Sequence, residues 1–405
     1  MANNALTADV VAKVALPILE NELGIINQLY RAHESEFDST VNGYKKGDTV
    51  RIRRPADFTV RSGAVMSTQD VIEGNTSLVV DQIKGIDFKF SSTEMTLKVE
   101  DLAMRVIKPA MSNLANAITL DVLTQMYQGT YNYVGTPGTR VSTFSSFSRA
   151  PERLDELSAP SSERGAVMCP NDFWGMVGSN TALFAPTVVQ SALRTGELGD
   201  LGGMNTWMSQ VVPGFLTGTR VGGTIGGAAQ NVLYDTVKLT WSQTLNLTAA
   251  SVAGIANAGD VFTIAGVNMV NPKTKADTGI LQQFVVLTTT GAAPASVSSS
   301  PPIISSGPYQ SVTAAPANAA AITWVGTAAT TYRQNMAFHK NAMALAFVPM
   351  EMPPAAFGAS RETYKGISVR IIPTYDGVND ISKWRLDVLY GRKMIDPRII
   401  TRFNG

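Results

Sequence analysis

The first clear pattern in the chain is an alternation of apolar and basic positions. In segment 44–55, Val50 and Ile52 alternate with arginines, and this period of two predicts a strand with one apolar and one basic face. Two partner strands are predicted at 78–83 and 85–90, and the turn-rich stretch 62–74 separates them from the first strand. A hairpin of this kind buries too little apolar area to be stable alone. We therefore expect an extended β loop that packs on another surface.

Helical periodicity follows at 97–128. Apolar residues recur there at every fourth position, which predicts one long helix; its apolar face consists of Leu102, Val106, Ala110, Leu114, Ile118, Val122 and Met126, flanked by Ile107 and Met111. Pro109 should bend this helix because proline removes a main-chain hydrogen bond, and Gly129 should end it. A helical arm is also predicted within 1–40, from the apolar residues Val10, Val14, Ile18 and Leu19 around Pro17.

The middle of the chain carries short strand, helix and loop signals. Segment 168–177 predicts a strand that runs into a helix, with Pro170 in the first turn and Asn171 or Asp172 near the cap. The glycine-rich stretch 195–204 predicts a mobile loop.

A composition shift begins near Pro213. Charged residues become rare up to Tyr332, and Thr, Ser, Ala, Gly and Val prevail. Strands are predicted at 237–241, 261–265, 284–288 and 321–325, with a Ser/Pro/Ala loop at 289–316. These signals predict an all-β insertion, in the form of a small barrel.

The overall composition limits which kinds of partner the chain can have. Hydrophobic residues make up 44% of the 405 residues and charged residues only 16%, below the roughly 25% of typical soluble chains. Much of the surface is therefore expected to be covered by partners. The net charge of +1 argues against a surface that neutralises a nucleic-acid backbone. The sequence shows neither a signal peptide nor a membrane span, and the single cysteine, Cys169, is expected to be a small buried residue.

Motifs for catalysis are missing. The two histidines, His33 and His339, lie far apart in sequence, and neither belongs to a metalloprotease helix; His339 is expected to be a partly buried helix residue. The glycine cluster 222–227 lacks the Lys-Ser/Thr of a phosphate loop, and no Gly-x-Ser-x-Gly elbow occurs. We therefore predict no enzyme, no catalytic residue, no metal and no cofactor.

Three segments carry a family resemblance, and the first is Gly-Asp-Thr-Val-Arg-Ile-Arg-Arg-Pro at 47–55, in the predicted extended loop. The C-terminal run includes Ala-Phe-His-Lys-Asn-Ala at 337–342, an Arg-Ile strand at 366–372 and Asp-Val-Leu-Tyr-Gly at 387–391. It resembles the closing segment of tailed-phage major capsid proteins of the Hong Kong 97 fold. The segment 258–275, with Gly-Asp-Val-Phe-Thr-Ile-Ala-Gly-Val followed by Val-Asn-Pro-Lys-Thr, is similar to the insertion domain of coat proteins of the Salmonella short-tailed phage branch.

The resemblance implies an α+β fold of the Hong Kong 97 type with an inserted all-β domain. The implied parts are an N-terminal arm (1–43), an extended β loop (44–92), a peripheral domain with the spine helix (93–144), an axial domain (145–221), an inserted β barrel (222–332), an axial return (333–365) and peripheral C-terminal strands (366–405).

The implied function is that of a major capsid protein. Hexamers and pentamers would form an icosahedral virion shell, assembled in the host cytoplasm with a scaffolding protein and a portal protein; the shell would expand during packaging and enclose DNA without specific binding. Arg51, Arg53 and Arg54 are candidate subunit-interface residues, or else a solvated strand face. The alternative, favoured by the Thr/Ser-rich β module, is a cell-surface or tail-associated binding protein.

Overall fold

The computed structural model describes residues 8–37, 44–61, 63–66, 68–91, 103–179, 200–354 and 358–405. Helices and long sheets occur together, so the predicted α+β class is confirmed. The chain divides into two compact units: the first comprises residues 1–51, 77–122 and 343–393, and the second comprises 52–76, 123–342 and 394–405.

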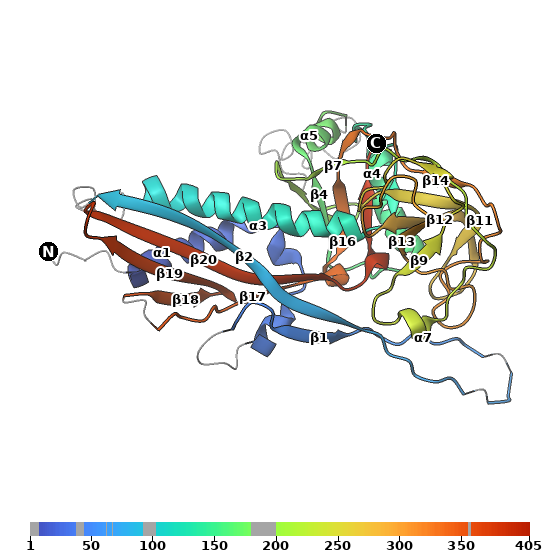
Figure 1. Ribbon diagram of the computed structural model, residues 1–405, viewed down its shortest axis with the longest axis horizontal. Helices are drawn as coiled ribbons and strands as arrows, with labels where there is room; N and C mark the ends of the chain where they lie inside the picture. The colour runs from blue at the N-terminus through green and yellow to red at the C-terminus, as the bar shows by residue number, and fades with distance from the viewer. Residues whose placement is uncertain are drawn as a thin grey trace. The chain divides into compact units, whose positions relative to one another are not determined.

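The first unit is organised by a sheet of long antiparallel strands (Figure 1). The strand order is β1 (Thr49–Arg53), β2 (Asn75–Ser91), β20 (Ile381–Met394), β19 (Ile367–Asp376) and β18 (Ser360–Tyr364), and β17 (Met343–Val348) also pairs with β20. The predicted break between two strands, at residue 84, is wrong, because β2 runs through it without interruption. Gly85 lies against β20 so closely that a Cβ there would meet Leu386 O at 2.6 Å. Glycine at this position therefore permits strand pairing.

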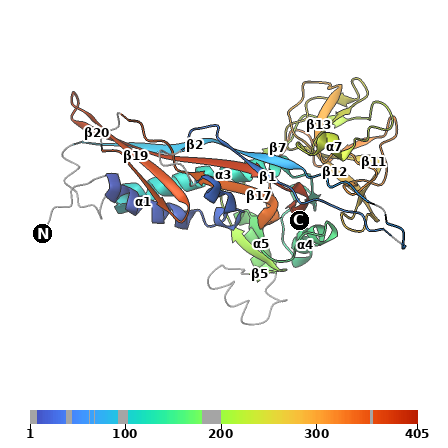
Figure 2. The same cartoon turned by 90° about the horizontal axis from the view of Figure 1, so that it is seen from below.

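The N-terminal helix α1 (Ala8–Glu22) packs on β18 and β19 of the same chain (Figure 2). Its buried face consists of Ala8, Val11, Ala12, Ala15, Leu16 and Leu19. This face is offset from the predicted one, since Val10, Val14 and Ile18 are only partly buried. The helix continues through Pro17, and two short 3-10 turns follow, η1 (Ile26–Gln28) and η2 (Ala32–Phe37).

The long helix begins later than predicted. A π-helical segment, η4 (Ala103–Ile107), leads directly into α3 (Lys108–Gly129), while positions 97–102, including Leu102, lie outside the described residues. Pro109 is the second residue of α3, in its first turn, where proline is favoured. The helix ends at Gly129, as predicted. Ile107 and Met111, predicted to flank the face, are fully buried, whereas Val106 and Ala110 are only partly so.

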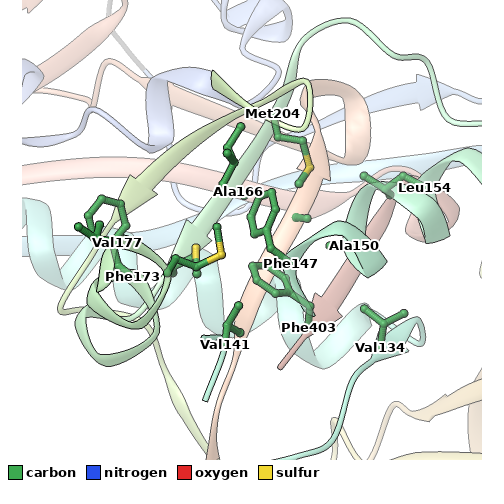
Figure 3. Close-up of a cluster of buried hydrophobic side chains, with 14 of the residues drawn as sticks. Val134, Val141, Phe147, Ala150, Leu154, Ala166, Phe173, Val177, Met204 and Phe403 are labelled. Carbon is green, nitrogen blue, oxygen red and sulfur yellow. The ribbon is translucent and has the colours of Figure 1, made fainter. Parts of the chain in front are cut away.

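A second sheet forms the centre of the second unit. Its order is β3 (Tyr133–Val134), β21 (Ile400–Phe403), β16 (Asn335–His339), β4 (Arg164–Met168), β6 (Met204–Met208) and β5 (Asp200–Leu201). Helices α4 (Phe144–Glu156) and α5 (Pro170–Ser179) contribute to the same apolar core, in which Phe147, Phe173 and Phe403 are buried (Figure 3).

Local signals explain the ends of these elements. The Thr143 hydroxyl accepts a hydrogen bond from Ser146 N at 3.2 Å and caps α4. Pro170 begins α5, as predicted. In the predicted glycine-rich loop, 195–199 lie outside the described residues. Gly202 and Gly203 form a tight turn between β5 and β6 with φ of 58° and 72°, so this part is a hairpin.

The composition shift coincides with a small barrel. Five strands follow the order β14 (Ile322–Trp324), β11 (Val261–Val270), β12 (Asp277–Val286), β13 (Ser296–Ser300) and β9 (Gln243–Asn246). The edges are joined through residues 224 and 225, since Thr224 bridges to Ala321 beside β14 and Ile225 bridges to Leu247 beside β9. The interior is apolar, with Phe262, Phe284 and Val297 among its buried residues.

Two predictions within this region are wrong. Residues 237–241 are not a strand: the short helix α7 (Tyr234–Val237) and a turn occupy the place. The segment 289–316 is not simply a loop, because it contains β13 and buries Val297, Ile303, Ile304 and Val312.

The chain enters and leaves the barrel through paired strands. Strand β7 (Gly214–Leu216) pairs antiparallel with β15 (Thr331–Arg333), and β8 (Val221–Gly222) pairs with β10 (Val252–Ala253). Beside them, the buried pair Arg220 and Asp260 approaches to 3.0 Å, and Asp260 also accepts hydrogen bonds from Gly218 N and Asn257 N. These contacts fix the start of the barrel to its first long strand.

Candidate assembly surface

The predicted interface arginines lie at the start of the extended loop and divide into two kinds. Arg51 and Arg53 are exposed on β1. Arg53 lies 3.6 Å from Glu73 on the returning arm of the loop, with 84% and 48% of the two side chains exposed. Such an exposed ion pair contributes little to stability. The guanidinium groups of Arg51 and Arg53 are therefore both available to a partner surface.

Arg54 has a different environment. The side chain is half-buried. The main-chain N–H of Arg54 donates a hydrogen bond to Gly74 O at 2.8 Å, and this bond joins the two arms of the loop. Burial lowers the pKa of the Arg54 guanidinium, although Asp396 acts in the opposite direction. Gly74 is needed here, because a Cβ would come within 2.6 Å of Lys238 O. The side chain of Arg54 therefore faces its own subunit.

The base of the loop is held by an aromatic cluster. Tyr309 donates a hydrogen bond from its hydroxyl to Ile72 O at 2.7 Å and accepts one from Asp57 N at 3.1 Å, so one side chain bridges both arms. Tyr309 stacks on Tyr234 with ring centroids 3.4 Å apart, and Trp241 completes the cluster. Burial, with the neighbouring Tyr309, raises the pKa of Tyr234 to about 12.

Ion pairs also hold the base of the loop. Arg398 lies 3.1 Å from Asp57 on the loop and 2.9 Å from Asp396 in its own short turn, η7 (Pro397–Ile399). Burial acts to raise the pKa of Asp396, but the Arg398 guanidinium outweighs it and the pKa is lowered. The Arg398 side chain thus links the C-terminal segment to the loop.

Beyond this anchor the loop exposes apolar side chains. Thr59 and Gln69 brace the two arms through reciprocal hydrogen bonds, with Thr59 N to Gln69 Oε1 at 2.9 Å and Gln69 Nε2 to Thr59 O at 2.6 Å. The apolar side chains that remain exposed there are Phe58 (57%), Val60 (97%), Val65 (85%), Met66 (78%) and Val71 (62%). We call these five residues the loop patch. Several exposed apolar residues on one braced loop indicate an interaction surface.

The two histidines and the cysteine, which were considered for chemistry, lie outside the extended loop. His339 ends strand β16, 2% exposed, so the predicted helical position is wrong; burial lowers the pKa of its imidazole. His33 lies in η2, in the other unit. Cys169 is buried as predicted, its S–H donates to Asp172 at 3.1 Å, and burial raises the pKa of the thiol.

Within the described ranges, no three His, Cys, Asp or Glu side chains gather as a metal-binding set. None of the helices in the described part of the chain is both long and apolar enough to cross a bilayer.

Sequence reasoning missed the residues that anchor the loop. Tyr309 lies in the segment predicted as a loop, Trp241 in a predicted strand, and Asp57 and Arg398 belong to segments far apart in sequence. No local pattern in the chain indicates that these residues meet.

The chain is similar to several solved structures. Among solved structures, one from Mycobacterium phage Che8 is 13% identical, with 94% of this chain and 90% of that chain covered and a TM-score of 0.48. The capsid of Ralstonia phage GP4 is 9% identical, with 91% and 87% covered and a TM-score of 0.41. The CUS-3 coat protein I-domain is 31% identical, covering 26% of this chain and 96% of that domain, with a TM-score of 0.20.

No curated protein matches the chain. The family model described as P22 coat protein, gene protein 5, matches residues 2–404. Because this match extends over nearly the whole sequence, the chain belongs to the P22 coat protein family.

Proposed function

We propose that many copies of this coat protein assemble as hexamers and pentamers into the icosahedral head of a tailed double-stranded DNA phage. Assembly takes place in the host cytoplasm around a scaffolding protein and with a portal protein, and the procapsid expands when DNA is packaged. The packaged DNA is enclosed without specific binding, in keeping with the net charge of +1.

Membership in the coat protein family makes the chain a structural, non-enzymatic component of the virion capsid. It also favours the shell subunit over the alternative of a cell-surface or tail-associated binding protein. The domain division given by the resemblance, with an inserted β barrel at 222–332, is part of the same proposal; the closed five-stranded sheet within that range supports it.

The observation that carries the proposal is the loop patch. The base of the loop is fixed to the subunit by Tyr309 and Arg398, while its far part leaves Val60 97% exposed and Met66 78% exposed. A firmly anchored loop that leaves apolar side chains in water is explained if a neighbouring copy covers them. We propose that this contact holds adjacent subunits together.

Arg51, Arg53 and Arg54 remain candidate interface residues within this proposal. The exposure of Arg51 and Arg53 suits pairing with carboxylates of a neighbouring copy, whereas the side chain of Arg54 is half-buried in its own subunit. Replacing all three together would therefore mix an assembly effect with a folding effect. The double variant R51A/R53A separates them.

The test compares assembly with subunit stability. V60S/M66S and R51A/R53A should melt like the unaltered subunit, because the replaced side chains are exposed. Both variants should give fewer shells by sedimentation and negative-stain electron microscopy. The matched control is V378S, which removes an apolar side chain that is 92% exposed on another hairpin. Normal shell yields from V60S/M66S, or an equal loss in V378S, would contradict a specific role of the loop patch.

A further inference from the structure

The base of the extended loop is held by side chains that belong to the barrel. Tyr309 lies between β13 and β14, is 8% exposed, and contacts both arms of the loop through its hydroxyl. Lys275, in the turn between β11 and β12, interacts electrostatically with Asp57 on the outgoing arm, and both residues line one small hollow beside Tyr309. Two segments of the barrel therefore constrain the direction in which the loop leaves its base.

The barrel itself is fixed to the central sheet of the second unit. Gln283 in β12 and the main chain of Tyr133 in β3 form two reciprocal hydrogen bonds, with Tyr133 N to Gln283 Oε1 at 2.7 Å and Gln283 Nε2 to Tyr133 O at 2.8 Å. Asn271, which follows β11, donates from Nδ2 to Glu156 O at the end of α4 at 2.9 Å. Arg402 in β21 donates to a carbonyl oxygen just before β11 at 3.0 Å. A barrel joined to the sheet only through β7 and β15 could turn about that connection, and these contacts oppose such a rotation.

We propose that the barrel positions the extended loop, and that Tyr309 is the positioning residue. Contacts then run without a break from the central sheet through the barrel to both arms of the loop, so the loop patch is presented in one direction. An interface whose parts are already ordered loses less conformational entropy on binding, and a closed shell needs closely similar contacts in every copy. This inference rests on the proposed function, in which the loop patch contacts a neighbouring copy.

The ring and the hydroxyl of Tyr309 have separate roles. The ring stacks on Tyr234 with centroids 3.4 Å apart and so packs within the aromatic cluster. The hydroxyl accepts a hydrogen bond from Asp57 N at 3.1 Å and donates one to Ile72 O at 2.7 Å, and both of these partners are main-chain groups of the loop. The variant Y309F removes the hydroxyl and keeps the ring, so it tests positioning with the packing of the barrel preserved.

Hydrogen exchange in the full-length, unassembled subunit tests the contact itself. The amide of Asp57 should exchange about tenfold faster in Y309F, because it loses its acceptor, and an effect of this order is expected for one hydrogen bond. The matched control is Y332F, which removes a hydroxyl that accepts from Thr327 N at 3.0 Å, in β15. Y332F should leave the exchange of Asp57 unchanged, and β11 should exchange alike in both variants.

The direction of the loop is measured by pulsed electron resonance between two spin labels. The labels are placed at V65C on the loop and T244C on β9, in a C169S background that removes the native thiol. Val65 and Thr244 are both exposed, so the labels disturb no packing. We expect a narrow distribution of label distances in the subunit that keeps Tyr309 and in Y332F, and a broad distribution in Y309F. Without labels, Y309F should also give fewer shells by sedimentation than Y332F.

An unchanged distance distribution in Y309F, or equal broadening in Y332F, would overturn the positioning role. If Y309F does not fold, K275M decides: it removes the charge that the barrel places near Asp57, so the distribution should broaden, and a narrow one would overturn the proposal. The result is separable from the proposed function. Normal shells from V60S/M66S would refute the loop patch as an interface, whereas the distances in unassembled subunits do not depend on that outcome.

Discussion

Replacing Ile118 with Ala in α3 should destabilise the subunit substantially. Ile118 is 0% exposed, on the helix face that also buries Leu114 and Val122. The substitution removes three buried carbon groups, a loss of about 2.4 kcal/mol at roughly 0.8 kcal/mol each. The cavity left behind adds to this cost, while the better helix propensity of alanine recovers a few tenths of a kcal/mol. We expect a net loss of about 3 kcal/mol.

Leu120 provides the matched control on the same helix. It is 43% exposed, so L120A should lose only about 1 kcal/mol for the buried part of the side chain. Urea denaturation of unassembled subunits measures both variants; with a typical urea dependence of about 1–3 kcal/mol per M, I118A should lower the midpoint by at least about 1 M.

Hydrogen exchange locates the effect. Peptides from residues 108–122 of α3 and from β19, which belong to the first unit, should exchange faster in I118A, whereas peptides from β11 in the barrel serve as an internal reference. Equal midpoints for I118A and L120A would show that the buried face of the helix has been wrongly identified.

Three further predictions concern the second unit. Because its pKa is depressed in the folded state, Asp396 contributes stability above the unfolded value of about 3.9 and loses it as the pH falls through the folded value; urea midpoints between pH 7 and pH 3 should therefore fall less steeply in D396N, and parallel curves would count against this role. Limited proteolysis of the folded subunit should cut within the exposed stretch 291–293 rather than at Val297 or Val312, which are buried; early cleavage between 297 and 312 would be inconsistent with the packed segment. Residues 222–332 expressed alone should give dispersed amide signals by NMR, because the barrel contains its own apolar core; a collapsed spectrum would show that it depends on the rest of the chain.

Features with a local cause were predictable from the sequence. The α+β class, the end of α3 at Gly129 and strand β11 all follow from periodicity or from a single residue preference. The exposed basic positions Arg51 and Arg53 also followed from strand alternation. That alternation ends with β1 at Arg53, which is why it could not indicate that Arg54 faces inward.

Features that depend on distant neighbours were missed. The predicted break between two strands fell next to Gly85, whose close approach to β20 favours glycine within one continuous strand. Segment 289–316 was classified by its abundant Ser, Pro and Ala, which concealed the few apolar residues that pack into the barrel. The anchor of the loop unites Asp57, Tyr309 and Arg398, and pairing across such separations leaves no periodic trace in sequence.

The pairing of β7 with β15 has a consequence for how this chain could have been built. Leu216 and Thr331 face each other in the antiparallel register, so a two-residue turn could join them directly, as in an ordinary hairpin. Everything between these two positions can thus be gained or lost in a single genetic event with the pairing of β7 and β15 kept, while the base of the extended loop would lose Tyr234, Trp241 and Tyr309. The same two positions offer a place to graft a foreign domain of similar end-to-end spacing, with little entropic cost for closing the connection.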